Sequence, residues 1–390
     1  MRSDWTQSTI GDACALVTDG AHTSPKSVEM GKIMASVKDF TEYGFDFSGC
    51  RRISEDDYNK LKMSGCVPQY EDILIGKDGA RYFEDIIIYR QSEEPALLSS
   101  IAILRCDKTK IIPDFLYYLL KTPSMRQDVK DNYGSGSAIP RIILKDFKRM
   151  PITFPTIDEQ KKIIRVLGIL DRKIQNNQEI NKNLEQQAQA LFKSWFVDFE
   201  PFDGSKPSNW KLSTLDEVSK MGAGGDKPQI VSPYKTPDCP YPIYSNGLSD
   251  EGLYGYTNSA KIFDESVTVS ARGTIGFVCL RHIPYVPIVR LVTLVPHTEV
   301  LSAKYLFFWL KQLHIAGTGT TQQQLTVPAF QKTEILVPSI DTVTLFDEIV
   351  DPIYQTIWSN QSENEQLASI RNTLLPKLMS GELDVSDIDF

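Results

Sequence analysis

Residues 151–199 read PITFPTIDEQKKIIRVLGILDRKIQNNQEINKNLEQQAQALFKSWFVDF. This segment is the main clue to the fold, because the chain contains a second version of it. That version, ILVPSIDTVTLFDEIVDPIYQTIWSNQSENEQLASIRNTLLPKLMSG, occupies residues 335–381. When Pro155 is aligned with Pro338, the offset of 183 holds through both segments without a gap. Such a repeat predicts two copies of one structural element.

Within each copy, apolar and asparagine residues recur in steps of four and three, which places them in one narrow stripe along a helix. This is the seam of a coiled coil, on helices roughly 60 Å long. The predicted seam contains Leu167, Leu170, Ile174, Asn177, Asn181 and Leu184 of the first helix and Val350, Ile353, Ile357, Asn360, Asn364 and Leu367 of the second. Two ordinary amphipathic helices in separate cores are the alternative, but they do not explain an ungapped repeat.

The ends of both helices carry recognisable signals. Thr156 and Glu159 fit a capping box, with Asp158 as an alternative cap, and Asp341 is the predicted cap of the second helix. Pro352 lies inside the second helix and is expected to kink it, because proline cannot donate to the preceding turn.

Weaker matches extend the repeat outside the helices, for example Trp5 with Trp210, at an offset that shrinks from 205 to 183 along the chain. The predicted order is domain 1 (1–155), first long helix (156–199), a linker rich in Pro, Gly and Ser (200–209), domain 2 (210–338), second long helix (339–381) and an acidic tail (382–390).

Each domain is predicted to have a mixed α/β (α+β) fold. Short strands are expected at 72–75, 86–89, 101–104, 267–270 and 291–295, and helices at 115–120 and 305–310. Because the linker is short, the second helix can bury its seam only by packing back along the first. This geometry predicts an antiparallel pair with an approximate two-fold axis, in which Asn177 faces Asn364 and Asn181 faces Asn360.

Composition limits the classes of function. The net charge is −8, of which the segment 381–390 supplies −4, and an acidic chain disfavours indiscriminate nucleic-acid binding. The chain has no run of about 18 apolar residues and no apolar segment near its N-terminus, so neither a membrane span nor a signal peptide is expected. Its six cysteines are scattered, which favours the reducing cytoplasm.

We find no catalytic or metal-binding constellation. Phosphate-loop, dinucleotide-binding and amino-methyltransferase motifs are absent, and the four histidines lack metal-ligand spacing. Pro113-Asp114 with Glu159 and Lys161 superficially matches a nuclease pattern. The first turn of a long helix explains that acid and that base equally well. The chain is therefore predicted to be non-enzymatic by itself.

Polar, glycine-rich loops recur at matching places in both halves and suit binding. Hydroxyls and backbone N–H groups suit phosphates, whereas Arg and Gln can pair with guanine and adenine edges. The candidate DNA-binding residues are Asp19, His22, Thr23, Lys77, Arg81, Ser135, Ser137 and Arg141 of domain 1, and Arg272, Thr274, Thr318, Thr320, Gln322, Gln323 and Gln324 of domain 2. Domain 1 lacks the glutamine run 322–324, so the two domains should read different bases.

Together these features resemble the specificity subunit of type I restriction–modification systems. The match rests on Asp19-Gly-x-His-x-x-Pro25, the turn after the strand at 72–75, the prolines that precede both helices, the Asn-x-x-x-Asn-x-x-Leu pattern within them and Trp195-Phe-Val-Asp-Phe-Glu-Pro-Phe202. It covers nearly the whole chain.

The resemblance implies a non-catalytic subunit that binds double-stranded DNA. Each target recognition domain would read one half of a split, asymmetric site, while the helices set the gap and hold two modification (methyltransferase) subunits. S-adenosylmethionine, ATP and Mg²⁺ would belong to the modification and restriction subunits. The alternative is a scaffold that binds only proteins through its two repeated modules, and the acidic charge slightly favours it.

Overall fold

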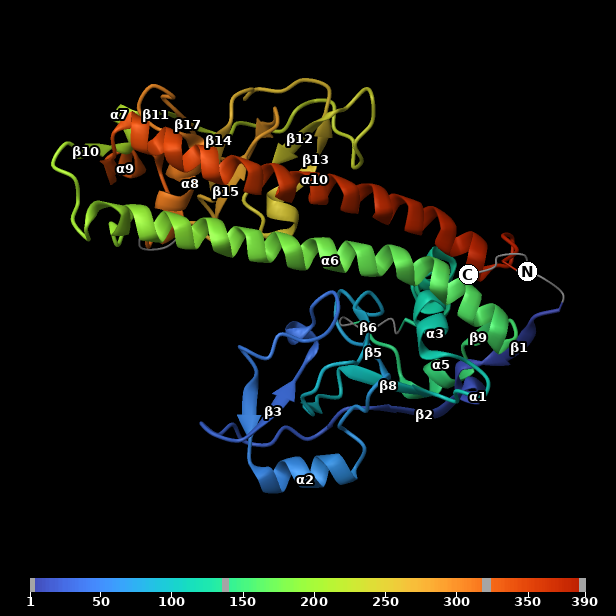
Figure 1. Ribbon diagram of the computed structural model, residues 1–390. Coiled ribbons are helices and arrows are strands. Elements are labelled where there is room, and N and C mark those ends of the chain that lie inside the picture. Colours follow the sequence, from blue (N-terminus) through green and yellow to red (C-terminus); the bar gives the residue numbers. More distant parts are fainter. Residues whose placement is uncertain (1–3, 135–139, 318–323, 386–390) are drawn as a thin grey trace. The chain divides into compact units, whose positions relative to one another are not determined.

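The computed structural model describes residues 4–134, 140–317 and 324–385 (Figure 1). It divides into two compact units, Met1–Asn177 with Ser362–Phe390 and Gln178–Gln361. Each unit combines one mixed α/β domain with half of α6 (Ile157–Phe196) and half of α10 (Ile340–Met379). None of the helices in these described ranges is long and apolar enough to cross a membrane.

The domain of unit 1 contains three small sheets. The first is antiparallel in the order β2-β8-β5-β6, from β2 (Cys14–Asp19), β8 (Ile101–Cys106), β5 (Ile73–Gly76) and β6 (Ile86–Ile88). The second has the order β4-β3-β7, from β4 (Arg51–Ile53), β3 (Lys32–Ala35) and β7 (Ala96–Leu97). The third pairs β1 (Thr6–Thr9) with β9 (Pro151–Phe154). Its helices are α1 (Ile10–Ala13), α2 (Glu55–Met63), α3 (Pro113–Leu120), α4 (Pro123–Asn132) and α5 (Leu144–Arg149).

The domain of unit 2 repeats this topology. Its antiparallel sheet has the order β11-β17-β14-β15, from β11 (Ser219–Ala223), β17 (Val292–Pro296), β14 (Ser266–Val269) and β15 (Val278–Arg281). Its second sheet has the order β13-β12-β16, from β13 (Leu253–Thr257), β12 (Tyr241–Tyr244) and β16 (Val286–Pro287). The strand β10 (Lys211–Thr214) pairs with β18 (Glu334–Val337), and the helices are α7 (Leu215–Val218), α8 (Ala303–Gln312) and α9 (Val327–Phe330).

Two helices account for most of the change in offset along the chain. Domain 1 contains α2 and α4, and no helix stands at the equivalent places in the described part of domain 2. The shared strand order therefore confirms the internal repeat, and the extra residues of domain 1 are insertions between common elements.

The central strand β5 is buried on both faces, which explains its unbroken apolar sequence. Ile73 and Ile75 point to the main core of unit 1, whereas Leu74 points to a smaller cluster around Tyr89. In unit 2, Val267 of the equivalent strand β14 belongs to the main core. Alternation of side chains along a strand thus holds one sheet between two apolar layers.

In unit 1 the first half of α6 packs on the last half of α10. Asp171 Oδ1 lies 2.7 Å from Arg371 Nη1, and the Asn177 amide donates to Asn364 Oδ1 at 2.9 Å. Residue numbers rise along one helix as they fall along the other, so the helices are antiparallel here. The predicted contact between Asn177 and Asn364 is confirmed.

Unit 2 holds the other two halves in the same antiparallel sense. Asn360 donates to Asn181 Oδ1 at 2.8 Å, as the register predicts. Farther along, the rings of Phe192 and Phe196 lie 5.9 and 5.1 Å from the ring of Phe346. This aromatic cluster belongs to the main core of unit 2.

The predicted seam positions are all removed from solvent to some degree. Six are buried (Leu167, Ile174, Asn177, Asn181, Val350 and Ile357) and the other six are half-buried. A buried asparagine loses hydration, so its amide must find partners within the protein. The asparagine pairs meet that demand only in one register, which fixes how the helices align.

The helix ends partly correct the sequence-based prediction. The N–H of Glu159 donates to Thr156 Oγ1 at 3.4 Å, which confirms Thr156 as a cap of α6. Ser339, rather than Asp341, caps α10, since its Oγ accepts from the N–H of Thr342 at 3.4 Å. The helix begins one residue before Asp341, so this carboxylate lies in the first turn, where it still favours the positive end of the helix. The helix continues without interruption past Pro352.

Each domain is attached to the long helices by polar contacts within its own unit. In unit 1, Tyr118 of α3 donates to Asp171 of α6 at 2.7 Å. In unit 2, Lys304 of α8 lies 3.1 Å from Asp351 of α10, and Ser302 donates to Asp347 at 2.9 Å. Ser302 also caps α8 by accepting from the N–H of Tyr305. These contacts tie each domain to the helix segments of its own unit.

Candidate functional site

Two separate sequence motifs of domain 1 meet at the carboxylate of Asp19. This residue ends β2, and its Oδ1 lies 3.1 Å from His22 Nε2 in the following turn. Its Oδ2 lies 3.5 Å from the Nζ atom of Lys77, which follows β5. Strands β2 and β5 both pair with β8, so the loops that follow them meet at one edge of the sheet and residues 58 positions apart form one cluster.

Burial gives the members of this cluster different roles. Asp19 and Lys77 are each only 7% exposed, and Lys77 also lies 3.4 Å from Asp78. Two carboxylates therefore neutralise the lysine beneath the surface, where the ion pair supports the loops. In contrast, the side chain of His22 is 74% exposed, and Thr23 beside it is also exposed. The turn that starts at His22 therefore forms the exposed surface above the buried ion pair.

Arg141 lies at the same exposed edge of domain 1, which the loops after β2 and β5 form and which we call the rim. An isolated β-bridge joins it to Asp78, and the N–H of Gly79 donates to Pro140 O at 3.0 Å. Arg81 lies farther along the loop and is exposed, but Asp85 Oδ1 lies 2.7 Å from its Nη2. The hydrogen bond to Asp85 raises the pKa of Arg81, whose charge is thus already matched within its own loop.

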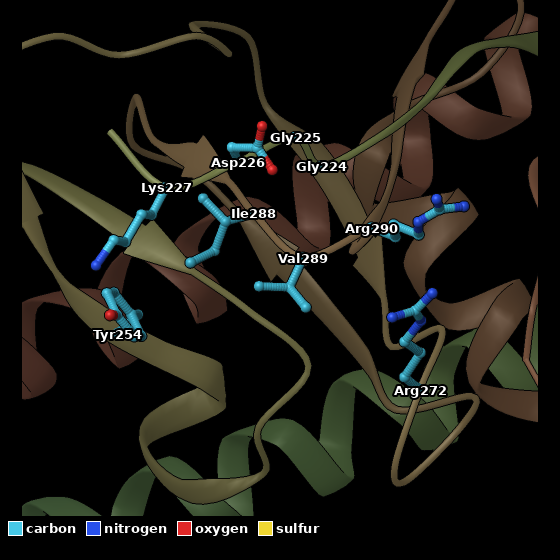
Figure 2. Close-up of a pocket in the computed structure, with 9 residues that line it drawn as sticks. All are labelled: Gly224, Gly225, Asp226, Lys227, Tyr254, Arg272, Ile288, Val289 and Arg290. Atoms are coloured by element: carbon cyan, nitrogen blue, oxygen red, sulfur yellow. The ribbon is translucent and has the colours of Figure 1, made fainter. Parts of the chain in front are cut away.

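Domain 2 presents its candidate residues around two neighbouring cavities. Arg272 follows β14, and its Nη2 donates to Gln324 Oε1 at 3.3 Å. A cavity of about 460 Å³ is lined by Gly224, Gly225, Asp226, Lys227, Tyr254, Arg272, Ile288, Val289 and Arg290 (Figure 2). A smaller one of about 170 Å³ is lined by Ala223, Ala271, Arg272, Arg290, Val292, Gln324, Leu325, Thr326, Val327 and Pro328. Arg272 and Arg290 line both, and Thr274 is exposed in the same loop as Arg272.

Several predicted residues cannot be placed. Ser135 and Ser137 of domain 1, and Thr318, Thr320, Gln322 and Gln323 of domain 2, lie outside the described residues. Their role stays a prediction from the sequence.

Backbone hydrogen bonds show that the rim of domain 1 is equivalent to the edge of domain 2 that carries Arg272 and Gln324, which we call the rim of domain 2. The N–H of Ile142 donates to Lys77 O at 3.0 Å, and the N–H of Leu325 donates to Ala271 O at 2.9 Å. Position 141 of domain 1 therefore corresponds to position 324 of domain 2, and position 78 corresponds to position 272. An Asp–Arg pair in domain 1 is thus replaced by an Arg–Gln pair in domain 2.

The support beneath the rim changes in the same way. Asp19 stands opposite Ala102 across β2 and β8, and Ala223 stands opposite Val292 across β11 and β17. Position 19 thus corresponds to position 223, and the buried Asp19–Lys77 ion pair is replaced by two alanines, Ala223 and Ala271. An ion pair can be exchanged for apolar residues only as a whole, because a single buried charge is costly.

Sequence reasoning missed Arg290, Lys227 and Asn246. No local motif marks Arg290, which follows β16 at a corner between two sheets. A closer comparison of Gly20-Ala21 with Gly224-Gly225 would have found the loop that contains Lys227, since both dipeptides follow equivalent strands.

Within the described part of the chain, no group of three or more His, Cys, Asp or Glu side chains is arranged to hold a metal ion. The polar groups on both rims are donors and acceptors suited to recognition, and several sit on short loops held between strands.

Comparison with known proteins gives a consistent result. A family model described as the type I restriction modification DNA specificity domain matches residues 2–186 and 207–369. The MjaIX type I restriction enzyme specificity subunit of Methanocaldococcus jannaschii is 28% identical over 314 residues, covering 72% of this chain and 71% of that protein. The HindI specificity subunit of Haemophilus influenzae is 26% identical over 361 residues, covering 70% and 78%.

The fold has a solved counterpart. The crystal structure of a type I restriction–modification S subunit from M. genitalium superposes with a TM-score of 0.57 over 96% of both chains. Its sequence is 17% identical, so this likeness concerns the fold alone.

Proposed function

We propose that this chain, which belongs to the type I restriction–modification DNA specificity family, reads one half of a split DNA sequence with each of its two domains. The observation that carries the proposal is the equivalence of the two rims. The same backbone hydrogen bonds support both, but different side chains occupy the equivalent positions. One architecture that presents two sets of donors and acceptors suits an asymmetric target.

In this proposal, residues 1–155 and 210–338 are the two target recognition domains. Domain 1 would contact DNA through His22, Thr23, Arg81 and Arg141, whereas buried Asp19 and Lys77 would position the loops. Domain 2 would use Arg272, Thr274 and Gln324. Arginine pairs with the O6 and N7 atoms of guanine and glutamine pairs with the N6 and N7 atoms of adenine, so the two half-sites should differ.

The long helices would set the gap between the half-sites and dock the partner subunits. The antiparallel seam with its asparagine pairs supports a role as a rigid spacer. Exposed apolar side chains on α10, namely Leu345, Ile349 and Ile370, suit protein docking. Two modification subunits would bind there and supply S-adenosylmethionine, while restriction subunits would supply ATP and Mg²⁺ chemistry. The complex would work in the cytoplasm, where it meets foreign DNA.

The test is selection from a pool of randomised DNA duplexes by the full chain assembled with its modification subunits. We expect the bound sequences to share a motif of two short parts separated by an unread gap of fixed length. Enrichment of one contiguous motif would contradict the two-domain reading. No retention even at low salt would favour a scaffold that binds only proteins. Equal retention of all sequences would show DNA binding without sequence reading, which also contradicts the proposal.

A further inference from the structure

The corner that carries Arg290 has an unusual backbone. Val289 and Arg290 adopt left-handed conformations, with φ of +52° and +61°. This region is unfavourable for a β-branched residue such as valine, and strain of this kind is concentrated at ligand-binding sites. The strained pair places Arg290 in the lining of both cavities of domain 2.

Neighbouring groups hold this corner in place. The N–H groups of Val289 and Arg290 donate to Gly225 O and Gly224 O at 2.9 and 2.8 Å. A Cβ atom at Gly224 would lie 2.7 Å from the backbone nitrogen of Ile288, so only glycine permits this close approach. The strained conformation is therefore maintained by the fold around it.

One side chain links this corner to the loop of Arg272. The Asn246 amide donates to Val289 O at 2.7 Å, and its Oδ1 accepts from the N–H of Ala271 at 2.7 Å. The residues next to both arginines are thus fixed by the same amide. Figure 2 shows the two guanidinium groups on one side of the cavity, with Lys227 and Tyr254 on the other.

The surroundings favour a base edge over a phosphate. Gln324 occupies one of the five N–H donors of Arg272 and orients its planar group. The carboxylate of Asp226 lines the same cavity and can accept from the N4 amino group of cytosine, whereas the ammonium of Lys227 on the other side suits a phosphate. In the major groove, one arginine can contact the guanine and the carboxylate the cytosine of a G·C pair. The other arginine can then contact a guanine of the neighbouring base pair.

Resting on the proposed function, we infer that Arg290 is a second specificity-determining residue of domain 2, and that Arg272 and Arg290 each bind a guanine. The half-site read by domain 2 therefore contains two guanines, on the same strand or on opposite strands. At the position equivalent to Arg290, domain 1 has Ser100, since Gly20 N–H bonds Ile101 O as Gly224 N–H bonds Leu291 O. This guanine contact belongs to domain 2 alone.

The duplex selection described above tests this inference with variants of the full chain. Arg290→Gly removes the side chain, and glycine accepts a φ of +61° without strain. Arg290→Lys keeps the charge but loses the two-pronged donor geometry. Arg290→Gly is expected to reduce the preference for guanine at one base of one half-site by about 5- to 150-fold. Arg290→Lys should reduce it by a smaller factor, because an ammonium still donates to guanine. Arg272→Ala should reduce the preference for guanine at another base of the same half-site. Lys332→Ala removes an exposed charge outside both cavities and should leave every preference unchanged.

The possible outcomes separate the two proposals. If the wild-type chain enriches a split motif but Arg290→Gly and Arg290→Lys change no base preference, the inference is wrong while the proposed function stands. A uniform loss of affinity for all sequences with a weaker salt dependence would assign Arg290 to a phosphate and also overturn it. If the wild-type chain enriches no motif, the proposed function itself fails. Circular dichroism checks that each variant is folded. If Arg290→Gly is unfolded, the guanine preference of Arg290→Lys provides the test.

Discussion

At the scale of single residues, Asp347 shows how burial of a charge makes stability depend on pH. Burial raises the pKa of Asp347 to about 6, although Ser302 donates to it. The pKa of an unfolded aspartate is about 4, so between pH 4 and 6 the folded chain binds more protons than the unfolded chain. This contribution to the free energy of unfolding therefore falls as the pH rises through that window.

Asp347→Asn should remove the penalty while keeping an oxygen that accepts from Ser302. We expect it to stabilise unit 2 by about 1–2 kcal/mol at pH 8, after allowance for partial exposure, and to have little effect at pH 4. Urea unfolding followed by tryptophan fluorescence measures this, because four of the five tryptophans lie in unit 2. Glu348→Gln, at an exposed neighbour, is the control. A gain that is the same at both pH values would contradict the assignment.

At the scale of secondary-structure elements, the asparagine pairs determine how α6 and α10 align. The Asn177 side chain is 1% exposed and donates to Asn364 Oδ1 and to Glu363 Oε2 at 2.9 and 2.7 Å. Asn177→Ala leaves the half-buried oxygen of Asn364 without this donor. The free energy of unfolding should fall by about 1–3 kcal/mol.

The adjacent Asn176 provides a matched control because it has the same side chain on the exposed face of α6. Asn176→Ala should change the free energy of unfolding by no more than about 0.5 kcal/mol. Replacing both partners, as in Asn177→Leu with Asn364→Leu, should recover most of the lost stability, because the amide pair is removed as a whole and Glu363 keeps its ion pair with Lys173. Equal stability of the Asn176 and Asn177 variants would show that the pair does not hold the register.

At the scale of the whole molecule, both long helices cross from one unit to the other between Asn177 and Gln178 and between Gln361 and Ser362. Inserting four helix-forming residues at both crossings lengthens each helix by about 6 Å and keeps the seam nearly in phase. The contacts inside each unit are unchanged. If the helices set the spacing, the unread gap should grow by about one to two base pairs while both half-sites stay the same.

Duplex selection with the inserted chain measures the gap directly. Inserting two residues at each crossing rotates the seam by roughly half a turn and should destabilise the helix pair instead. An active four-residue variant with the parental gap would show that another part of the complex sets the spacing.

The features that depend on local periodicity can be predicted from the amino-acid sequence. Steps of four and three residues predict a helix and its buried stripe because helical geometry repeats every 3.6 residues. The ungapped offset aligns Asn177 with Asn360 and Asn181 with Asn364. A two-fold axis between antiparallel helices then predicts that Asn177 faces Asn364 and that Asn181 faces Asn360. The strand β5 was recognisable for the same reason, since a short apolar run is typical of a strand buried on both faces.

Which side chains share a site depends instead on tertiary packing. Lys77 has the same polar character in the sequence as Arg141, yet the neighbouring strands bury Lys77 against Asp19 and leave Arg141 exposed. Arg290 carries no motif, and it joins Arg272 because Asn246, Gly224 and Gly225 hold a strained corner beside another loop. These contacts connect residues far apart in the chain, and their distances depend on how the sheets pack rather than on any local repeat.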